Sequence, residues 1–142
     1  MATQRNLSGG CTCGAVRYVA RADPILMLNC HCRDCQRASG SAFAPLVVVP
    51  QGSLEIRGEL RYHAVVGGSG TRVERGFCPT CGNPVAIKLA RMPDIVGVMA
   101  GSLDEPGLHT PTVEIFTASA HPWDHMAPDT RKIAHGLSPQ PT

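Results

Sequence analysis

Three cysteines, Cys30, Cys32 and Cys35, lie within a single short stretch, Asn-Cys-His-Cys-Arg-Asp-Cys. Thiols at this spacing suit three kinds of chemistry: an oxidised disulfide staple, a thiol redox pair with a spare cysteine, or three of the four ligands of a zinc ion. The zinc interpretation leaves one corner of the coordination tetrahedron to be filled from elsewhere.

The other four cysteines form two further groups, Cys11 with Cys13 and Cys78 with Cys81. The last group lies in Cys-Pro-Thr-Cys-Gly, which is typical of a zinc knuckle, because the glycine allows a tight turn that directs backbone N–H groups toward sulfur. Structural zinc takes four ligands, whereas a catalytic zinc keeps one position open. Seven sulfurs therefore divide naturally as four plus three.

Spacing alone does not decide which two groups share the closed site. If Cys30, Cys32 and Cys35 stay together, the closed site consists of Cys11, Cys13, Cys78 and Cys81. Such a site would join two distant parts of the chain. Structural zinc contributes about 10–16 kcal/mol to the folding of small peptides, which exceeds the net stability of most domains.

Composition favours metal over disulfides. The chain has no apolar leader segment, so we expect a cytoplasmic protein whose thiols stay reduced, and its 7 cysteines are an odd number for a disulfide framework. A net charge of +2 with scattered charges indicates no nucleic-acid partner, and no apolar run is long enough to span a membrane. The length of 142 residues predicts one zinc-binding domain over residues 1–142, and the sequence indicates no oligomeric state.

The elements that must hold the cysteines are predicted to be short strands. Apolar or alternating runs separated by glycine and proline predict strands at 15–20, 25–29, 42–50, 53–58, 60–66, 71–77, 84–90, 94–101 and 112–119. We expect a hairpin at Gly58-Glu59, a flexible tip at 67–70, and helix only at 34–39 and 129–134. Residues 1–8 and the final Ser-Pro-Gln-Pro-Thr are expected to be loose. The fold class is therefore all-β.

With these motifs in place, the chain resembles the glutathione-dependent formaldehyde-activating family, which includes centromere protein V. The stretches GGCTCGAVRY, CHCRDCQRASGSAF, FCPTCGNPVAIK, GSLDEP and HPWDH occur in the family's order, so the recognisable core covers about residues 9–126. The resemblance implies a β-tent fold of folded antiparallel sheets. It implies a structural zinc on Cys11, Cys13, Cys78 and Cys81, and a catalytic zinc on Cys30, Cys32 and Cys35. With three thiolate ligands, the second zinc is expected to be the more labile of the two.

The activity implied by the resemblance is a carbon–sulfur lyase reaction, in which glutathione and formaldehyde combine to S-hydroxymethylglutathione. A zinc with three thiolate ligands activates water poorly, but it binds a thiol as thiolate, so a small thiol or its aldehyde adduct suits the open position. Two alternatives stay open: a non-enzymatic binding module stabilised by zinc, and a thiol-redox or metal-handling protein.

Candidate partners for the carboxylates of glutathione are Arg33, Arg37 and Arg72, of which the first two flank the cysteines. Gln36 and Ser41 belong to a polar loop just after Cys35 and are candidate pocket residues. The predicted cofactor-binding set is therefore Arg33, Arg37, Gln36 and Ser41.

The histidines and the single tryptophan carry weaker predictions. His31 lies between two ligands, and in extended chain its side chain points away from theirs, which favours a supporting or surface role. His121 and His125 flank Trp123, and the sequence assigns them no role. Trp123 is expected to pack in the core. Glu114 to Phe116 and Ala120 to Trp123 depart from the family's usual pattern, which predicts a different substrate preference if they line the pocket.

Overall fold

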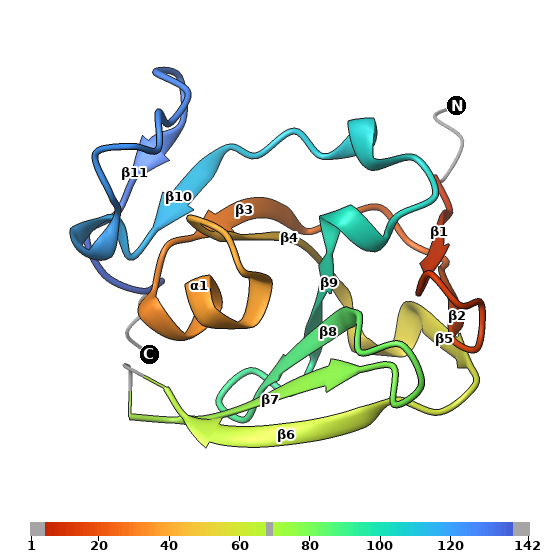
Figure 1. Cartoon of the computed structure of the whole chain (residues 1–142). Coiled ribbons are helices and arrows are strands. Elements are labelled where there is room, and N and C mark those ends of the chain that lie inside the picture. Colours follow the sequence, from red (N-terminus) through yellow and green to blue (C-terminus); the bar gives the residue numbers. More distant parts are fainter. Residues whose placement is uncertain (1–4, 68–69, 138–142) are drawn as a thin grey trace.

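The computed structural model describes residues 5–67 and 70–137, which form two β-sheets (Figure 1). The smaller sheet is antiparallel and has the order β1-β2-β5, with β1 at Leu7–Gly10, β2 at Arg17–Ala20 and β5 at Leu54–Arg57. The larger sheet has the order β11-β10-β3-β4-β9-β8-β7-β6.

The larger sheet and its connections supply the remaining elements. Its strands are β3 (Leu26–Cys30), β4 (Ala44–Pro50), β6 (Arg61–Val66), β7 (Arg72–Phe77), β8 (Pro84–Leu89), β9 (Ile95–Met99), β10 (Val113–Ile115) and β11 (Arg131–Lys132). Among the described residues there is one α-helix, α1 (Arg33–Ser39), with short 3₁₀ turns at Gln51–Ser53, Ala100–Ser102, Pro106–Leu108 and Thr117–Ser119. The prediction of a mostly β chain is confirmed.

Strand β4 explains why the sequence Leu-Val-Val-Val is continuously apolar. Val47 and Val49 face the smaller sheet and pack in one core with its Tyr18, whereas Leu46 and Val48 face the opposite side of the larger sheet and belong to a second core. A strand covered on both faces needs apolar residues at every position rather than at alternate positions.

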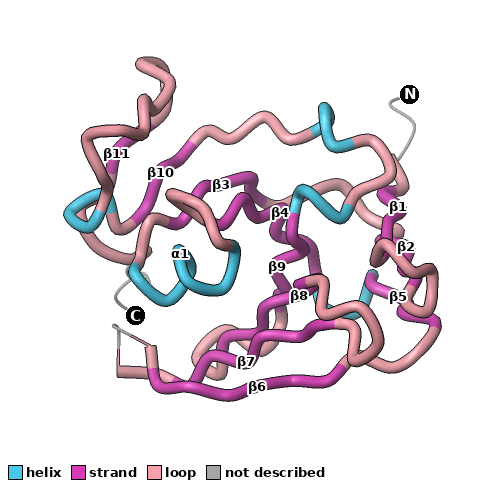
Figure 2. Tube along the Cα trace, in the orientation of Figure 1, coloured by secondary structure: helices cyan, strands magenta, loops and turns pink. Residues whose placement is uncertain are grey.

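The second face of the larger sheet curves around α1. In Figure 2, α1 lies between the part of the sheet that contains β3 and β4 and the part that contains β6 to β8. The register of the strands sets the floor of this concave face: Leu28 pairs with Leu46, and Val48 pairs with Gly97, which pairs with Ile87. The cysteine-rich segment before α1 therefore lies at one end of an apolar trough.

The hairpin predicted at Gly58-Glu59 is wrong. Strand β5 pairs with β2 and β6 pairs with β7, so this dipeptide carries the chain from one sheet to the other. Gly58 has φ +88°, and a Cβ there would collide with the backbone oxygen of Ala15. Glycine is therefore required here by a close approach of two backbone segments, and a hairpin turn gives the same local signal.

The chain ends also depart from prediction. Residues 129–134 are not helical: Arg131 and Lys132 form β11, which extends the sheet along β10 in parallel. The expected loose tail ends earlier than residue 8, because Leu7 is buried and begins β1. The last strand is shorter than 112–119, since Phe116 takes a left-handed backbone conformation directly after Ile115. The predicted loose C-terminal segment 138–142 and part of the predicted tip at 67–70 lie outside the described residues.

Within 5–67 and 70–137, no helix has the length and apolar character needed to cross a lipid bilayer.

Candidate metal centres

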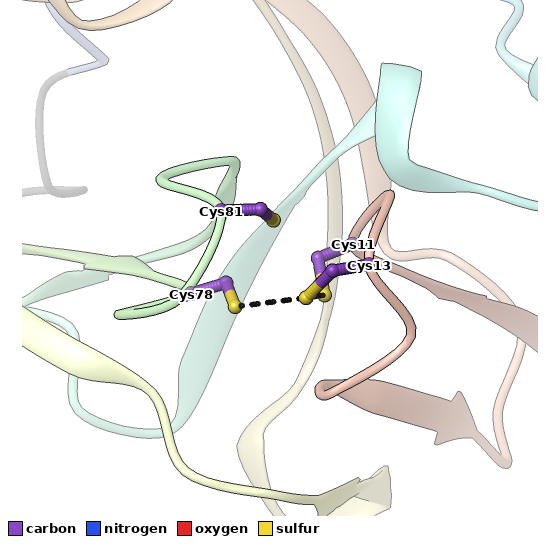
Figure 3. A group of neighbouring side chains, drawn as sticks. All are labelled: Cys11, Cys13, Cys78 and Cys81. Atoms are coloured by element: carbon purple, nitrogen blue, oxygen red, sulfur yellow. Dashed lines mark hydrogen bonds between the residues drawn. The ribbon is translucent and has the colours of Figure 1, made fainter.

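Two loops bring four cysteines together. The loop after β1 carries Cys11 and Cys13, and the loop after β7 carries Cys78 and Cys81; their sulfur atoms point toward one another in Figure 3 and lie within 4.8 Å of one another. Gly14 and Gly82, both with positive φ, follow the second cysteine of each loop and allow the tight turns.

The spacing of these sulfurs fits a tetrahedral zinc. The Sγ atoms of Cys11 and Cys13 are 3.5 Å apart, and those of Cys13 and Cys78 are 3.7 Å apart. Zn–S bonds of about 2.3 Å place tetrahedral sulfurs about 3.8 Å apart. All seven cysteines lie in the described part of the chain and none is in a disulfide. The loops are also linked without metal, since the Thr12 N–H donates to Asn83 Oδ1 at 2.7 Å.

The remaining three cysteines form the second group, which we call the three-cysteine centre (Cys30, Cys32 and Cys35). Their sulfurs also lie within 4.8 Å of one another. Cys30 is the last residue of β3, Cys32 is the N-cap of α1, and Cys35 lies in the first turn. Cys30 and Cys35 are buried, whereas Cys32 is half-buried.

Local chain chemistry fixes α1 and so orients the three sulfurs. The Cys35 N–H donates to Cys32 Sγ at 3.2 Å, which caps the helix, and Asp34 lies in the first turn and Arg37 in the last, as the helix dipole favours. Gly40, in the left-handed conformation, ends the helix.

The electrostatics of the three-cysteine centre call for a cation. Hydrogen bonds from Cys30 and Cys35 lower the pKa of Cys32 to about 2. The same contacts raise the pKa of Cys30, because a second thiolate would lie against the first. The Cys32 thiol therefore loses its proton easily, whereas a second thiol beside it does not. A divalent cation held by all three sulfurs would remove that repulsion, so the donor set fits zinc.

A buried polar network supports the centre from behind. His31, which lies between Cys30 and Cys32 in the sequence, is completely buried, and its Nε2 lies 2.8 Å from Glu114 Oε1. Its Nδ1 lies 3.5 Å from Asp124 Oδ2. The backbone N–H of His31 donates to the backbone carbonyl of Ile115 at 2.9 Å, and the side-chain Nδ2 of Asn29 donates to the Glu114 carboxylate. The parallel pairing of β10 with β3 thus holds the loop that carries the cysteines.

The sequence did not point to Asp124, and it drew attention to Glu114 only as a departure from the family's pattern, not as a partner of His31. A buried carboxylate at the centre of Val-Glu-Ile gives an ordinary alternating pattern, and its partner His31 lies far away in sequence. The parallel placement of two distant segments had to be known first.

Gln36 lies with this network and not in the pocket. It is 5% exposed; its Nε2 donates to the carbonyls of His31 and Ser119, and its Oε1 contacts Arg33 and His121. All of its hydrogen-bonding groups are thus used within the chain, which anchors α1 to the segment after β10.

A pocket of about 320 Å³ opens beside the three-cysteine centre. All three cysteines border it, and it extends along the concave face of the larger sheet past Leu46 and Ile87. Its lining is mostly aliphatic. The three-cysteine centre is therefore closed by protein on one side and faces a cavity on the other.

Arg75 borders both the pocket and the centre. Its Nη2 donates to Cys35 Sγ at 3.5 Å, and its buried Nε has no hydrogen-bond partner among the described residues. Arg75 and Val73 are two residues apart in β7, so their side chains lie on the same face of the sheet, and both line the pocket. The alternating pattern of Thr-Arg-Val-Glu-Arg-Gly-Phe therefore places Arg75, and not Arg72, on the inner face. Arg72 instead pairs with Glu74 at 3.0 Å on the outside.

The other predicted residues are not in the pocket lining. Arg33 and Arg37 are exposed on α1, and Ser41 is exposed in the loop after it. His125 is exposed, and His121 stacks on Trp123 with ring centroids 5.1 Å apart. Trp123 is 64% exposed, so its predicted place in the core is wrong; its ring stacks on His121 instead of on core residues.

Comparison with known proteins gives a consistent result. The family model described as glutathione-dependent formaldehyde-activating enzyme matches residues 6–119. A Halomonas elongata protein named "Putative glutathione-dependent formaldehyde-activating enzyme" is 30% identical over 103 residues, which cover 69% of this chain and 66% of that protein. The chain thus matches a little less than two thirds of that relative's length.

A crystal structure of a Rhodobacter sphaeroides protein is also similar. It has a TM-score of 0.53 and 25% sequence identity, and the match covers 68% of this chain and 87% of the other. Because the family model spans most of the chain, including both cysteine clusters, the chain belongs to the glutathione-dependent formaldehyde-activating enzyme family.

Proposed function

We propose that this protein holds a structural zinc on Cys11, Cys13, Cys78 and Cys81, and a second zinc on Cys30, Cys32 and Cys35, where a thiol and an aldehyde are joined or separated. The observation that carries the proposal is the position of the three-cysteine centre, whose sulfurs border a cavity. Zinc bound there would act as a Lewis acid that keeps a thiol substrate in its thiolate form.

The reaction needs no redox partner. In the forward direction the thiol sulfur forms a bond to the carbonyl carbon, the π electron pair of the carbonyl moves to oxygen, and that oxygen takes up the proton that the thiol released. With glutathione and formaldehyde, the pair in the family's name, the product is S-hydroxymethylglutathione. The lyase direction is the reverse.

The residues of the chain have separable tasks in this scheme. Cys30, Cys32 and Cys35 fix the place of the reacting sulfur, and the apolar walls exclude water from it. Arg75, whose buried Nε is without a partner among the described residues, is suited to donate a hydrogen bond to the oxygen that becomes negative. His31 and Glu114 hold the cysteine loop in position.

The test is the rate of exchange between free ¹³C-formaldehyde and its glutathione adduct, measured at equilibrium by NMR exchange spectroscopy. We expect the zinc-loaded protein to raise this rate and Cys32→Ser to abolish the effect. A thiol-bound complex with no rise in rate would favour the binding module. A Cys32–Cys35 disulfide that forms reversibly on mild oxidation, with zinc release, would favour the redox alternative. A reducing cytoplasmic compartment is part of the proposal, because it keeps the ligands as thiols.

A further inference from the structure

The lining of the pocket beside the three-cysteine centre is mostly apolar, whereas glutathione is a charged ligand. Among the described residues that line it, only Asp34, Arg75 and Arg91 are charged, and most of the others are leucine, isoleucine, valine, methionine or phenylalanine. Glutathione has two carboxylates and an ammonium group. Placing these against aliphatic walls leaves charges without partners, which is costly.

The register of the strands gives the pocket a direction. Leu26, Leu28 and Cys30 are every second residue of β3 and therefore share one face of the strand, where all three line the pocket. Val48, which pairs with Leu26, and Leu46, which pairs with Leu28, line the pocket as well. The four residue steps from Cys30 to Leu26 correspond to about 13 Å of strand. The apolar floor therefore begins at the sulfurs and runs away from them along the sheet.

Gly97 leaves space in the middle of this floor. It lies in the otherwise apolar strand Ile-Val-Gly-Val-Met and pairs with Val48 and Ile87, both of which line the pocket. A Cβ added there would meet its nearest atoms, from Leu46, at 3.5 Å and 3.7 Å, which is ordinary contact. Packing against the protein therefore does not require glycine at this position. Glycine inside a strand also marks places where a ligand approaches the backbone closely.

The charged lining does not compensate for a peptide-like ligand. Arg75 is directed at Cys35, and Asp34 would repel a carboxylate. Arg91 is exposed to solvent, where pairing with a carboxylate contributes little. Arg33 and Arg37, the carboxylate partners predicted from sequence, lie outside the lining. The pocket thus offers sulfur chemistry at one end and hydrocarbon contact along the rest.

We propose that the substrate of the three-cysteine centre is a thiol–aldehyde adduct with a hydrocarbon body, whose sulfur lies at Cys30, Cys32 and Cys35 and whose body lies over Gly97 along β3, β4, β8 and β9. This inference rests on the proposed function and names its substrate class. The bond changes are those of the addition described above. The hydrocarbon can belong to the thiol or to the aldehyde, and the experiment separates these two sources.

The first measurement is calorimetric binding to the zinc-loaded protein of ethanethiol, butanethiol, hexanethiol and glutathione. Affinity is expected to rise about fourfold for each added methylene, the effect of burying one CH₂ group. Hexanethiol should bind more tightly than glutathione. Alcohols of equal length and the Cys32→Ser variant should bind more weakly, because they lack one partner of the sulfur–zinc contact.

The matched variants are Gly97→Val and Gly101→Val. The first fills the pocket floor with an apolar side chain, whereas Gly101 is exposed, outside the lining, and has open space around it. Gly97→Val should weaken hexanethiol at least about tenfold and ethanethiol much less, since two to three methylenes lose their contacts. Gly101→Val should leave both affinities unchanged. Thermal unfolding of both variants verifies that they are folded.

The source of the hydrocarbon is decided by the exchange assay with two pairs, hexanethiol with formaldehyde and 2-mercaptoethanol with hexanal. The pair whose exchange the protein accelerates more, relative to the uncatalysed rate of the same pair, identifies which reactant carries the hydrocarbon body.

Three results would overturn the inference. Affinity that is flat with chain length, with catalysed glutathione exchange, would remove the hydrocarbon substrate and keep the proposed function. Chain-length dependence that is identical for alcohols and for Cys32→Ser would show that the alkyl sulfur does not reach the three-cysteine centre, and the inference would fail; absence of catalysed glutathione exchange in addition would make the proposed function fail as well. Absence of alkyl binding together with concentration-dependent self-association would assign this face to a second copy of the chain.

Discussion

Cys13 and Cys78, separated by 65 positions in the sequence, have their Sγ atoms 3.7 Å apart. Cys13 lies in the loop between β1 and β2 of the smaller sheet, and Cys78 directly follows β7 of the larger sheet, so this contact joins the two sheets. The three-cysteine centre joins only the end of β3 to the helix that follows it. The packing of the two sheets therefore depends on the four-cysteine cluster, whereas only a local segment depends on the three-cysteine centre.

Loss of the four-cysteine cluster is expected to cost far more stability than loss of the three-cysteine centre. Cys81→Ser removes a ligand of the proposed structural zinc, which would link the two sheets, and it should leave the chain largely unfolded, because structural zinc supplies about 10–16 kcal/mol in small zinc domains. Cys32→Ser should lower the zinc content by about one per chain and leave the fold intact. Circular dichroism with elemental analysis measures both. Equal loss of structure in the two variants would contradict this division.

Replacement of Arg75 is expected to slow the reaction without releasing metal. Arg75→Met keeps much of the side-chain volume but removes the donors beside Cys35, and kcat should fall about 10²-fold, as for other single donors to a developing oxyanion. Zinc content and the affinity for thiol should change little. Arg72→Met, on the outer face of the same strand, is the control and should behave as wild type.

An Arg75 variant with normal kcat and weaker thiol binding would instead assign this residue to substrate binding. A variant that loses zinc would assign it to the support of Cys35.

Glu114 is expected to be a positioning residue for the cysteine loop. Glu114→Ala leaves the buried groups of His31 and Asn29 without their acceptor and should destabilise the protein by about 1–3 kcal/mol for each unsatisfied group. Glu114→Gln keeps an acceptor oxygen and should cost less. Urea unfolding gives the stability, and a colorimetric zinc-release assay reports whether the three-cysteine centre loosens. Unchanged zinc release in Glu114→Gln and Glu114→Ala would limit Glu114 to a structural role.

Stability is expected to decrease as the solution is acidified through the range in which histidines titrate. Burial lowers the pKa of His109 below its ordinary value of 6.5, so the folded state favours the neutral ring and the unfolded state binds the proton more readily. The contribution of the neutral ring is present above that value and is lost as the pH falls toward the lowered folded-state pKa.

Urea midpoints at about pH 7.5 and about pH 5.5 measure this loss, and His109→Gln, which keeps a donor for Asn29, should show a smaller difference between the two. Metal release at low pH affects both proteins equally. An identical difference in the two proteins would exclude His109 as the cause.

The sequence predicted those parts of the fold that depend on local patterns. The alternating and continuous apolar runs gave most strands of the larger sheet, and the helix expected at 34–39 is confirmed by α1. It did not predict pairing between distant segments. Gly58 produces the signal of a hairpin although its neighbours pair elsewhere, and the two-residue strand β11 exists only because β10 offers an edge. In both cases the strand that provides the pairing partner lies far away in the sequence, so the local pattern does not reveal it.

The candidate site was predictable to the same extent. Cysteine types and spacing indicated two groups, and the structure brings together the four and the three that were expected. The pocket residues could not be found in this way, because Arg75 and Gly97 are far in sequence from Cys30, Cys32 and Cys35 and border the same pocket only through the register of the sheet. Proximity in sequence favoured Arg33 and Arg37 instead, which lie on the exposed side of α1.

The parallel pairing of β10 with β3 has a consequence for biosynthesis. The chain contains all four cysteines of the first cluster once Cys81 has been made, so that cluster can assemble while the last part of the protein is still on the ribosome. Cys30, Cys32 and Cys35 are made much earlier, but Glu114 and Ile115 reach them only when synthesis is nearly complete. The nascent chain therefore carries three close thiols without their buried support for most of its synthesis. This order makes the three-cysteine centre the later of the two to mature, and the one more exposed to oxidation before the protein has folded.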